Sequence, residues 1–205
     1  SSGSVSLDEC IRPSLTAERL AAMPPAFLAL GAAGSDAVQL SQYPELTKIA
    51  HVHTAGNSPA MCDAAAVLLV GSKMLASDKG LIPKVRIVDS VTCCGEPLEV
   101  VSGCVAATKA ILSRNKLSPS DVDVFEIHEA FAATIVKLQR ELEIDSARLN
   151  VNGGCIALGH PMGATGAIMA GTAIDELIRC DGSIGVIAAS GAAGSGSALL
   201  VERCY

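Results

Sequence analysis

Apolar runs of strand length alternate with helix-length segments from about residue 51 to the C-terminus, and this alternation limits the possible folds more than any other feature. The apolar runs predict five strands, at 64–71, 84–91, 122–127, 183–190 and 197–203. Helices are expected between them, at 72–80, 104–116, 129–143 and 161–178. Because a continuous apolar run such as 64–71 is typical of a strand covered on both faces, the pattern predicts an α/β fold: a mixed five-stranded sheet with helices on both faces.

Local signals support several of these boundaries. Ser72 is placed as the N-cap of the helix at 72–80 and Gly80 at its C-terminal stop. Ser118, followed by Asp121, predicts a capped turn before the strand at 122–127. The segment GAAGSG between the last two strands is a hairpin signal. We therefore expect the chain to end in two adjacent antiparallel strands.

Residues 1–45 differ from the rest of the chain. They contain one short helix signal, SLTAERLAAM, which Pro24 and Pro25 end, and then the small-residue stretch GAAGSDA. This is too little sequence to form a domain alone. We therefore interpret the segment as the end of a region whose beginning precedes this chain.

Composition excludes several classes of function. Half of the 205 residues are apolar but only 2 % are aromatic, so Ala, Val, Leu and Ile must build the core. A net charge of −6 with no basic run argues against nucleic acid as a partner. No apolar stretch reaches the roughly 18 residues of a membrane span, and the N-terminus shows no signal-peptide pattern. We expect a cytoplasmic protein of bacterial type, with a mitochondrial or peroxisomal location as the alternative.

The eight cysteines do not form a disulfide or zinc pattern. Cys93 and Cys94 are adjacent, the other six are scattered singly, and no C-x-x-C occurs. Most of these thiols are expected to be small buried side chains in a reducing compartment. His51 and His53 alternate along the chain and could share one face, but no further metal ligand accompanies them. We therefore predict no metal site.

Three loops carry residues suited to chemistry. They are IHEAF at 127–131, GHPMGATG at 159–166, and the hairpin tip around Ser190. In open α/β sheets, ligands bind outside the carboxyl ends of the strands, where His128 and Glu129 would lie. The simpler readings are a capping or packing role for His128 and a helix-dipole role for Glu129. The glycines at 159, 163 and 166 mimic a dinucleotide-binding spacing, but no ribose-binding acid follows a later strand.

Several segments together resemble the thiolase family. They are TAGNSPAMCDAAA, EIHEAFAA and NVNGGCIALGHPMGATGA, and the opening DECIRPSLTAERLAAMPPAF is similar to the family's preceding segment. The intervals from His128 to His160 and from His160 to Ser190 match those between thiolase active-site positions. The resemblance covers nearly the whole chain. It implies one βαβαβαββ half of a two-half thiolase, with residues 1–45 as the tail of the loop domain and connection and 46–205 as the C-terminal domain.

The resemblance also implies an activity and residue roles. Thiolases are acyl-CoA C-acyltransferases that cleave 3-ketoacyl-CoA with coenzyme A or condense two acyl-CoAs. His160 matches the base that activates a nucleophilic cysteine, and His128 matches a side chain of the oxyanion hole. The nucleophile belongs to the family's N-terminal half, and none of the eight cysteines has its context. The form HEAF is similar to thiolases of β-oxidation multienzyme systems, which favours a degradative role.

Four positions depart from the family pattern. Ser190 stands where the family has an acid/base cysteine, and its hydroxyl is far less acidic than a thiol with a pKa of about 8.5. Ala192 and Ala193 replace common glycines, although the Ala192 backbone N–H could still bind an oxyanion. Pro59 replaces a small or hydroxylic residue of the coenzyme A channel. Substrate contacts are expected at Pro59 and Ala192 and, in the glycine loop, at Met162 and Gly163.

Two functions are therefore consistent with the sequence. The first is the C-terminal part of an acyltransferase that lacks activity without its other half. The second is a thiolase-like protein that binds acyl-CoA without efficient turnover, and an NAD(P)-dependent oxidoreductase is a distant third. The expected partners are acyl-CoA, coenzyme A, an N-terminal thiolase half and, in the full protein, further copies in a dimer or tetramer. No cofactor is expected, since coenzyme A is a substrate.

Overall fold

The computed structural model describes residues 6–205, and a four-stranded mixed sheet forms its centre. The strands are β1 (Val85–Cys94), β2 (Val124–Ile127), β3 (Ile184–Ser190) and β4 (Ser195–Arg203), in the spatial order β1-β4-β3-β2. β4 pairs antiparallel with both β1 and β3, whereas β2 and β3 are parallel. The predicted hairpin is thus the β3–β4 pair at the middle of the sheet.

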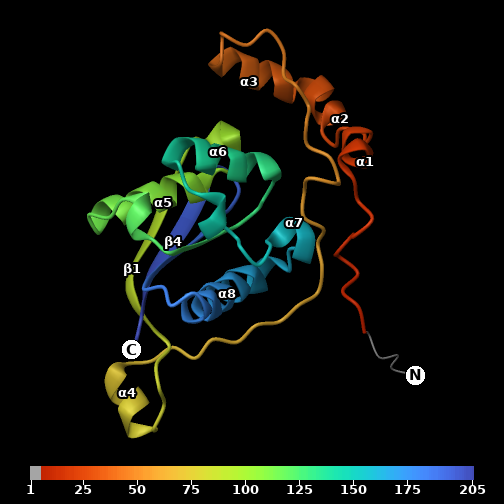
Figure 1. Ribbon diagram of the computed structural model, residues 1–205. Coiled ribbons are helices and arrows are strands. Elements are labelled where there is room, and N and C mark those ends of the chain that lie inside the picture. Colours follow the sequence, from red (N-terminus) through yellow and green to blue (C-terminus); the bar gives the residue numbers. More distant parts are fainter. Residues whose placement is uncertain (1–5) are drawn as a thin grey trace.

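Helices cover both faces of this sheet, as the sequence predicts (Figure 1). On one face lie α5 (Gly103–Arg114) and α6 (Ala132–Leu142), and on the other lies α8 (Thr165–Arg179). The strand period of two divides the core accordingly. Phe125 and Ile127 of β2 pack in the cluster with α5 and α6, while Val124 packs with Leu177 of α8. The α/β class with a mixed sheet is therefore confirmed.

The remaining elements are short. Before the sheet come α1 (Ala17–Ala21), α2 (Leu28–Leu30), the π-helical turn η1 (Gly31–Ser35), α3 (Asp36–Gln42) and α4 (Lys73–Asp78). Between the strands lie α7 (Cys155–Leu158) and the 3-10 turns η2 (Pro97–Glu99), η3 (Pro119–Asp121), η4 (Ser146–Arg148) and η5 (Met162–Ala164). None of the helices in residues 6–205 is long and apolar enough to cross a membrane.

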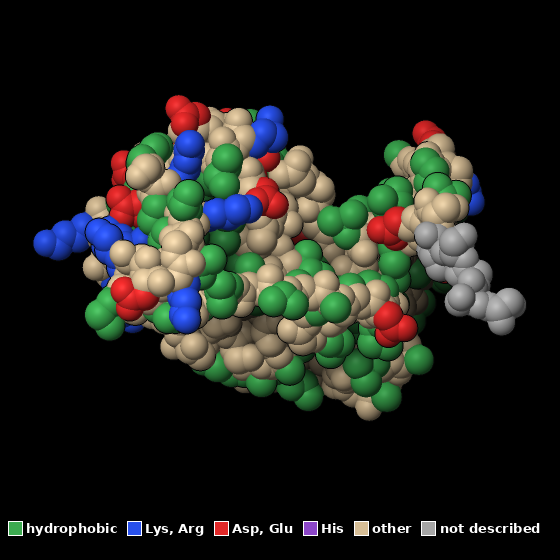
Figure 2. Space-filling model, turned by 90° about the horizontal axis from the view of Figure 1, so that it is seen from below, with side chains coloured by type: hydrophobic (Ala, Val, Ile, Leu, Met, Phe, Trp, Pro, Cys, Tyr) green, Lys and Arg blue, Asp and Glu red, His purple; other side chains and the backbone are tan. Residues whose placement is uncertain are grey.

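The predicted strand at 64–71 does not form. These residues are an extended segment without ladder hydrogen bonds, and they run between α3 and α4 along the outside of the domain (Figure 1). Val67 is 93 % exposed and Leu69 is 80 % exposed. A strand needs a neighbour for its backbone groups, and no segment among residues 6–205 pairs with this one. In Figure 2, many apolar side chains are exposed among other residues on the face seen from below.

Helix boundaries follow the capping chemistry. The Ser72 side chain accepts a hydrogen bond from the Leu75 amide at 3.1 Å, and Ser118 and Asp121 form a capping box, as predicted. The helix expected from residue 129 begins only at Ala132, because the three residues before it are extended or bent. The helix expected at 161–178 begins at Thr165, after the turn η5.

The N-terminus of α5 touches the β3–β4 hairpin with backbone against backbone. A Cβ atom on Gly103 would lie 2.0 Å from the Ser195 carbonyl oxygen, and one on Gly196 would lie 2.1 Å from the Gly103 carbonyl oxygen. Neither position can therefore hold a side chain without displacing main chain. This contact places the start of α5 directly beside the end of β3.

An aromatic cluster connects the N-terminal segment to the sheet domain. Phe27 and Phe131 have their ring centroids 5.8 Å apart in an edge-to-face arrangement, and the His53 ring lies 4.7 Å from that of Phe131. The Ala132 amide also donates to the Asn57 carbonyl at 3.0 Å. These contacts bring residues 53–57 beside the start of α6. The domain boundary at residue 45 stays a prediction.

Candidate active site

The parallel pair β2 and β3 places two of the predicted residues at one edge of the sheet. His128 follows the last residue of β2, and its amide donates to the Ala188 carbonyl of β3 at 2.8 Å. Ser190 is the last residue of β3. Because parallel strands end at the same edge, both side chains lie at the carboxyl end of the sheet, where α/β proteins bind ligands.

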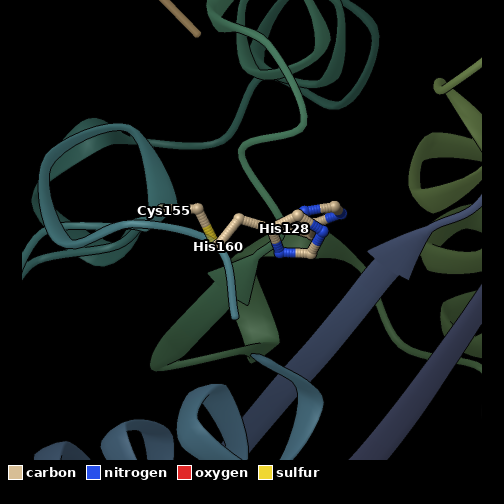
Figure 3. A group of neighbouring side chains, drawn as sticks. All are labelled: His128, Cys155 and His160. Atoms are coloured by element: carbon tan, nitrogen blue, oxygen red, sulfur yellow. The ribbon is translucent and has the colours of Figure 1, made fainter. Parts of the chain in front are cut away.

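The glycine loop brings His160 to the same place. The centroids of the His128 and His160 rings are 4.5 Å apart, with 37° between the ring planes (Figure 3). The His160 amide donates to the Ala60 carbonyl at 2.8 Å, which attaches the loop to the preceding extended segment. Its ring Nδ1 lies 2.8 Å from the Thr165 hydroxyl at the first residue of α8. This hydrogen bond orients the ring and leaves Nε2 for chemistry.

Burial favours the neutral form of both imidazoles. It lowers the pKa of His128 to about 4, and the neighbouring His160 adds to this effect. Burial also lowers the pKa of His160 below its ordinary value. Neither ring nitrogen of His128 has a hydrogen bond of ordinary geometry among the described residues, although the side chain is only 5 % exposed, and the nearby Ser190 backbone opposes burial by raising the pKa. The site thus holds one neutral imidazole with two unused polar atoms.

Two glutamates lie close to His128 in the sequence, and Glu129 has a structural role. Glu129 accepts hydrogen bonds from the Ile156 amide of α7 at 2.9 Å and from the Asn150 side chain at 3.0 Å. The helix-dipole role expected for it is therefore exerted on α7, a helix distant in sequence. Glu126 is 3 % exposed, and burial, with Glu129 and Glu176 nearby, raises its pKa to about 8. Its carboxyl is therefore protonated at neutral pH.

Ser190 lies between the hairpin and α5. Its hydroxyl oxygen accepts a hydrogen bond from the Cys104 amide at 2.9 Å, in the first turn of α5. An open pocket of about 270 Å³ adjoins this residue and is lined also by Thr92, Gly191 and Ser195. The hydroxyl is thus held at a helix N-terminus next to open space.

The predicted substrate contacts lie around this edge at different depths. Pro59 is half-buried and directly precedes Ala60, the residue that holds the His160 amide. Met162 is 63 % exposed, and no atom lies within 4 Å of a Cβ placed on Gly163. Ala192 is exposed at the hairpin tip, and its carbonyl accepts from the Ser195 hydroxyl at 2.9 Å. Their contacts with a substrate remain predictions.

Sequence reasoning missed two neighbours of the histidine pair. Thr165 orients His160, and only its place at the start of a helix could have indicated that role. Cys155, treated as a small buried side chain, is indeed 6 % exposed, but its Sγ belongs to a cluster with ring nitrogens of His128 and His160. Burial raises the pKa of this thiol to about 11.

The other histidine pair forms no comparable site. His51 Nε2 lies 2.9 Å from an Asp36 carboxylate oxygen, and His53 packs against Phe27 and Phe131. The two side chains therefore have separate partners. Within residues 6–205, three possible metal ligands come together at one place, formed by His128, Cys155 and His160.

Comparison with known proteins finds one matching family model and several similar curated proteins. Residues 81–203 match the family model described as "Thiolase, C-terminal domain". A curated relative, the 3-oxoadipyl-CoA/3-oxo-5,6-dehydrosuberyl-CoA thiolase of Escherichia coli K12, is 38 % identical over 198 residues, which are 96 % of this chain and 44 % of the relative. The chain spans about half the length of the curated relatives it matches.

Solved structures agree with the sequence comparison. The acetyl-CoA acetyltransferase of Bacillus anthracis superposes with a TM-score of 0.79 at 34 % identity, covering 96 % of this chain and 45 % of that one. Human mitochondrial 3-ketoacyl-CoA thiolase in complex with CoA superposes with a TM-score of 0.79 at 29 % identity, covering 98 % of this chain and 46 % of that one.

Proposed function

This chain belongs to the thiolase family, and from that premise we propose that it supplies the C-terminal half of an acyl-CoA C-acyltransferase site. The reaction is cleavage of a 3-ketoacyl-CoA by coenzyme A, or the reverse condensation of two acyl-CoAs. The nucleophilic cysteine comes from an N-terminal half. One observation carries the proposal: a buried His128 with two unused ring nitrogens lies against His160 at the carboxyl edge of the sheet.

His160 acts as the general base in this proposal. In the tautomer whose Nδ1–H donates to the Thr165 hydroxyl, Nε2 is an unprotonated acceptor. Its lowered pKa keeps that acceptor free at neutral pH. His160 Nε2 takes the proton of the incoming cysteine thiol, and the resulting thiolate attacks the 3-keto carbon of the substrate.

His128 stabilises negative charge in this proposal. A neutral imidazole can donate one ring N–H, and both ring nitrogens of His128 lack a partner among the described residues. Donors placed in a buried site before the reaction stabilise an oxyanion more than mobile water does. An oxygen of the thioester or of its enolate is the group that His128 would bind.

We expect proton transfer to be the slow step at this site. When the bond between the 2- and 3-carbons breaks, the acyl group stays on the cysteine and the departing acetyl-CoA enolate takes one proton. Coenzyme A then donates its thiol proton to a base, attacks the acyl-cysteine and releases the cysteine. Ser190 occupies the position for this proton transfer, and an alcohol is a much weaker acid than a thiol. We infer slow turnover with Ser190 and faster turnover with cysteine.

The ligands and partners follow from the same proposal. Acyl-CoA and coenzyme A are the small-molecule ligands, with Pro59, Met162, Gly163 and Ala192 as contacts. The human mitochondrial 3-ketoacyl-CoA thiolase that superposes on this chain is in complex with CoA, which supports this choice of ligand. An N-terminal thiolase half covers part of the apolar surface around residues 64–71, and the complete protein assembles as a dimer or tetramer.

Thiolysis of acetoacetyl-CoA by a longer chain, in which an N-terminal thiolase half with its cysteine precedes these residues, tests the proposal. Because a general base contributes about 10²–10⁴-fold, His160→Ala should lower formation of the acyl-cysteine by about that factor in rapid-quench mass spectrometry. His51→Gln, which changes a histidine bound to Asp36 instead, is the matched control. Acylation by His160→Ala within tenfold of the unmodified rate would rule out the base role.

The second candidate function is acyl-CoA binding without efficient turnover, and the hydroxyl at Ser190 favours it. Ser190→Cys in the longer chain separates the two candidates. Under the acyltransferase proposal the unmodified chain turns over and the variant is faster. Under the binding proposal the unmodified chain binds acyl-CoA in calorimetry but shows no turnover, and only the variant gains activity.

A further inference from the structure

Three possible metal ligands from separate positions in the chain meet beside the sheet edge. His128 follows β2, Cys155 is the first residue of α7, and His160 lies in the loop after α7 (Figure 3). One ligand atom from each side chain, two ring nitrogens and the sulfur, lies within 4.8 Å of the others. His128 and Cys155 are buried and His160 is partly buried. The cluster is therefore largely enclosed, and its three donor atoms lie close together.

The distances suit a small cation after a modest adjustment. With Zn–N of about 2.0–2.1 Å and Zn–S of about 2.3 Å, the donors of a tetrahedral zinc site lie about 3.4–3.6 Å apart. The three donors here must close by little more than about 1 Å. Rotation about the side-chain bonds of cysteine and histidine can supply a movement of that size.

The surroundings already orient the donors. Thr165 binds Nδ1 of His160, which leaves Nε2 as the ring nitrogen available to a metal, as outer hydrogen bonds do for metal-ligating histidines. Four residues separate Cys155 from His160, and the Gly159 amide donates to the Cys155 carbonyl at 2.9 Å, which fixes the turn between them. Glu129 holds the next residue of α7 through the Ile156 amide. The loop is thus held with its sulfur and imidazole together.

The burial of His128 gives a second indication of a ligand at this cluster. Its side chain is 5 % exposed, and neither ring nitrogen has a partner within residues 6–205. A buried polar atom without a hydrogen bond destabilises the folded protein. Coordination of a cation by one of these nitrogens would satisfy it, and the neighbouring donors are the two ligand types that zinc prefers.

We propose that His128, Cys155 and His160 form a binding site for a zinc-class divalent cation. The metal displaces the thiol proton of Cys155 to solution and is held by one thiolate and two imidazole nitrogens. The fourth position of a tetrahedron remains for water or an incoming thiolate. If the proposed acyltransferase function is correct, the same metal occupies both catalytic imidazoles, and the metal-bound protein is inactive. Binding itself does not depend on that function.

Titration of the 205-residue chain with Zn²⁺ or Co²⁺ alone tests the site. Because Cys10 and Cys62 place their sulfurs near Gly159 and could bind metal themselves, both are changed to serine in every sample. In this background we expect one tight ion per chain in calorimetry and, with Co²⁺, the visible bands of a tetrahedral site plus a thiolate-to-cobalt charge-transfer band in the near ultraviolet.

Cys155→Ser tests the sulfur and His128→Asn tests an imidazole, and each variant should lose the tight ion. Cys180→Ser, an exposed thiol at the end of α8, is the matched control and should leave stoichiometry and spectrum unchanged. Thr165→Val should weaken binding about 10–100-fold, since it removes the outer hydrogen bond to His160. Circular dichroism of each variant identifies a loss that reflects unfolding.

Two results would overturn the site: no tight ion in the background protein, or unchanged binding in folded Cys155→Ser or folded His128→Asn. Thiolysis by the longer chain is a separate measurement. Metal binding with no loss of thiolysis would refute the inhibitory consequence while retaining the site. Absent thiolysis with intact, Cys155-dependent binding would refute the acyltransferase function and leave the metal site supported.

Discussion

Replacing Glu126 by glutamine should remove a loss of stability that the protein undergoes as pH rises. The Glu126 carboxyl is 3 % exposed within β2, and its Oε1 has no partner among the described residues. Burial first, then the charges of Glu129 and Glu176, raise its pKa from 4.5 to about 8. Glutamine has nearly the same shape but carries no charge at any pH.

The sign of the effect follows from the raised pKa. The folded protein holds the Glu126 proton more tightly than the unfolded chain does, so this group's stabilising contribution is complete below pH 4.5. It is lost as pH rises toward about 8, at about 1.4 kcal/mol per pH unit. Between pH 5 and pH 7 the loss is roughly 2–3 kcal/mol, and across the whole interval it approaches about 5 kcal/mol.

The assay is urea unfolding of the unmodified chain and of Glu126→Gln at half-unit pH steps from 5 to 9. The difference between their free energies of unfolding should move in favour of the variant as pH rises, and level off above about pH 8. Glu143→Gln removes an exposed carboxyl after α6 and serves as the control, with a flat difference. A flat difference for Glu126→Gln as well would show that the carboxyl is ionised in the folded protein without cost, and the reasoning would be wrong.

Three further predictions concern the loop, the N-terminal segment and the base. Gly154→Ala should lower the free energy of unfolding by about 2–3 kcal/mol, because its Cβ would lie 2.2 Å from the Glu129 carboxyl carbon. Gly171→Ala is the control: a Cβ there meets open space, so this variant should be neutral or stabilising in the same denaturation experiment. Phe131→Ala should speed proteolysis within residues 27–53 while changing the global transition little, since it removes the edge-to-face contacts; unchanged cleavage would contradict that role for the cluster. Finally, the acidic limb of kcat/KM in the longer chain should have its midpoint below 6.5, because burial lowers the pKa of His160; a midpoint above 6.5 would exclude His160 as the group that titrates.

The sequence predicted the layers of the fold because period and caps are local properties. Ser72 and Ser118 indicate the starts of a helix and a turn, and the alternation of strand-length with helix-length segments indicates helices on both faces, without any knowledge of neighbours. The prediction of a strand at 64–71 was wrong because strand pairing is not a local property. An apolar run specifies that a segment can be buried, but only a neighbouring strand makes it a strand, and none among residues 6–205 pairs with it.

The candidate site was predictable where topology decides it. Parallel strands end together, so His128 and Ser190 could be placed at one edge, and the family resemblance brought His160 there as well. Cys155 could not be found in this way, because nothing in a run of small and apolar residues shows that its sulfur faces two imidazoles. The long-range bond from Glu129 to the Ile156 amide escaped prediction for the same reason, as it depends on how α7 is folded against β2.

The contact between Gly103 and Gly196 has a consequence for evolution. At each position a side chain would collide with main-chain atoms of the facing element, β4 for Gly103 and α5 for Gly196. Those main-chain atoms are present whatever residue the facing element carries. No compensating mutation can therefore make room for a side chain at either position. Across related sequences the two positions should stay glycine together and show no covariation, so a contact essential to placing Ser190 would be invisible to methods that infer proximity from correlated substitutions.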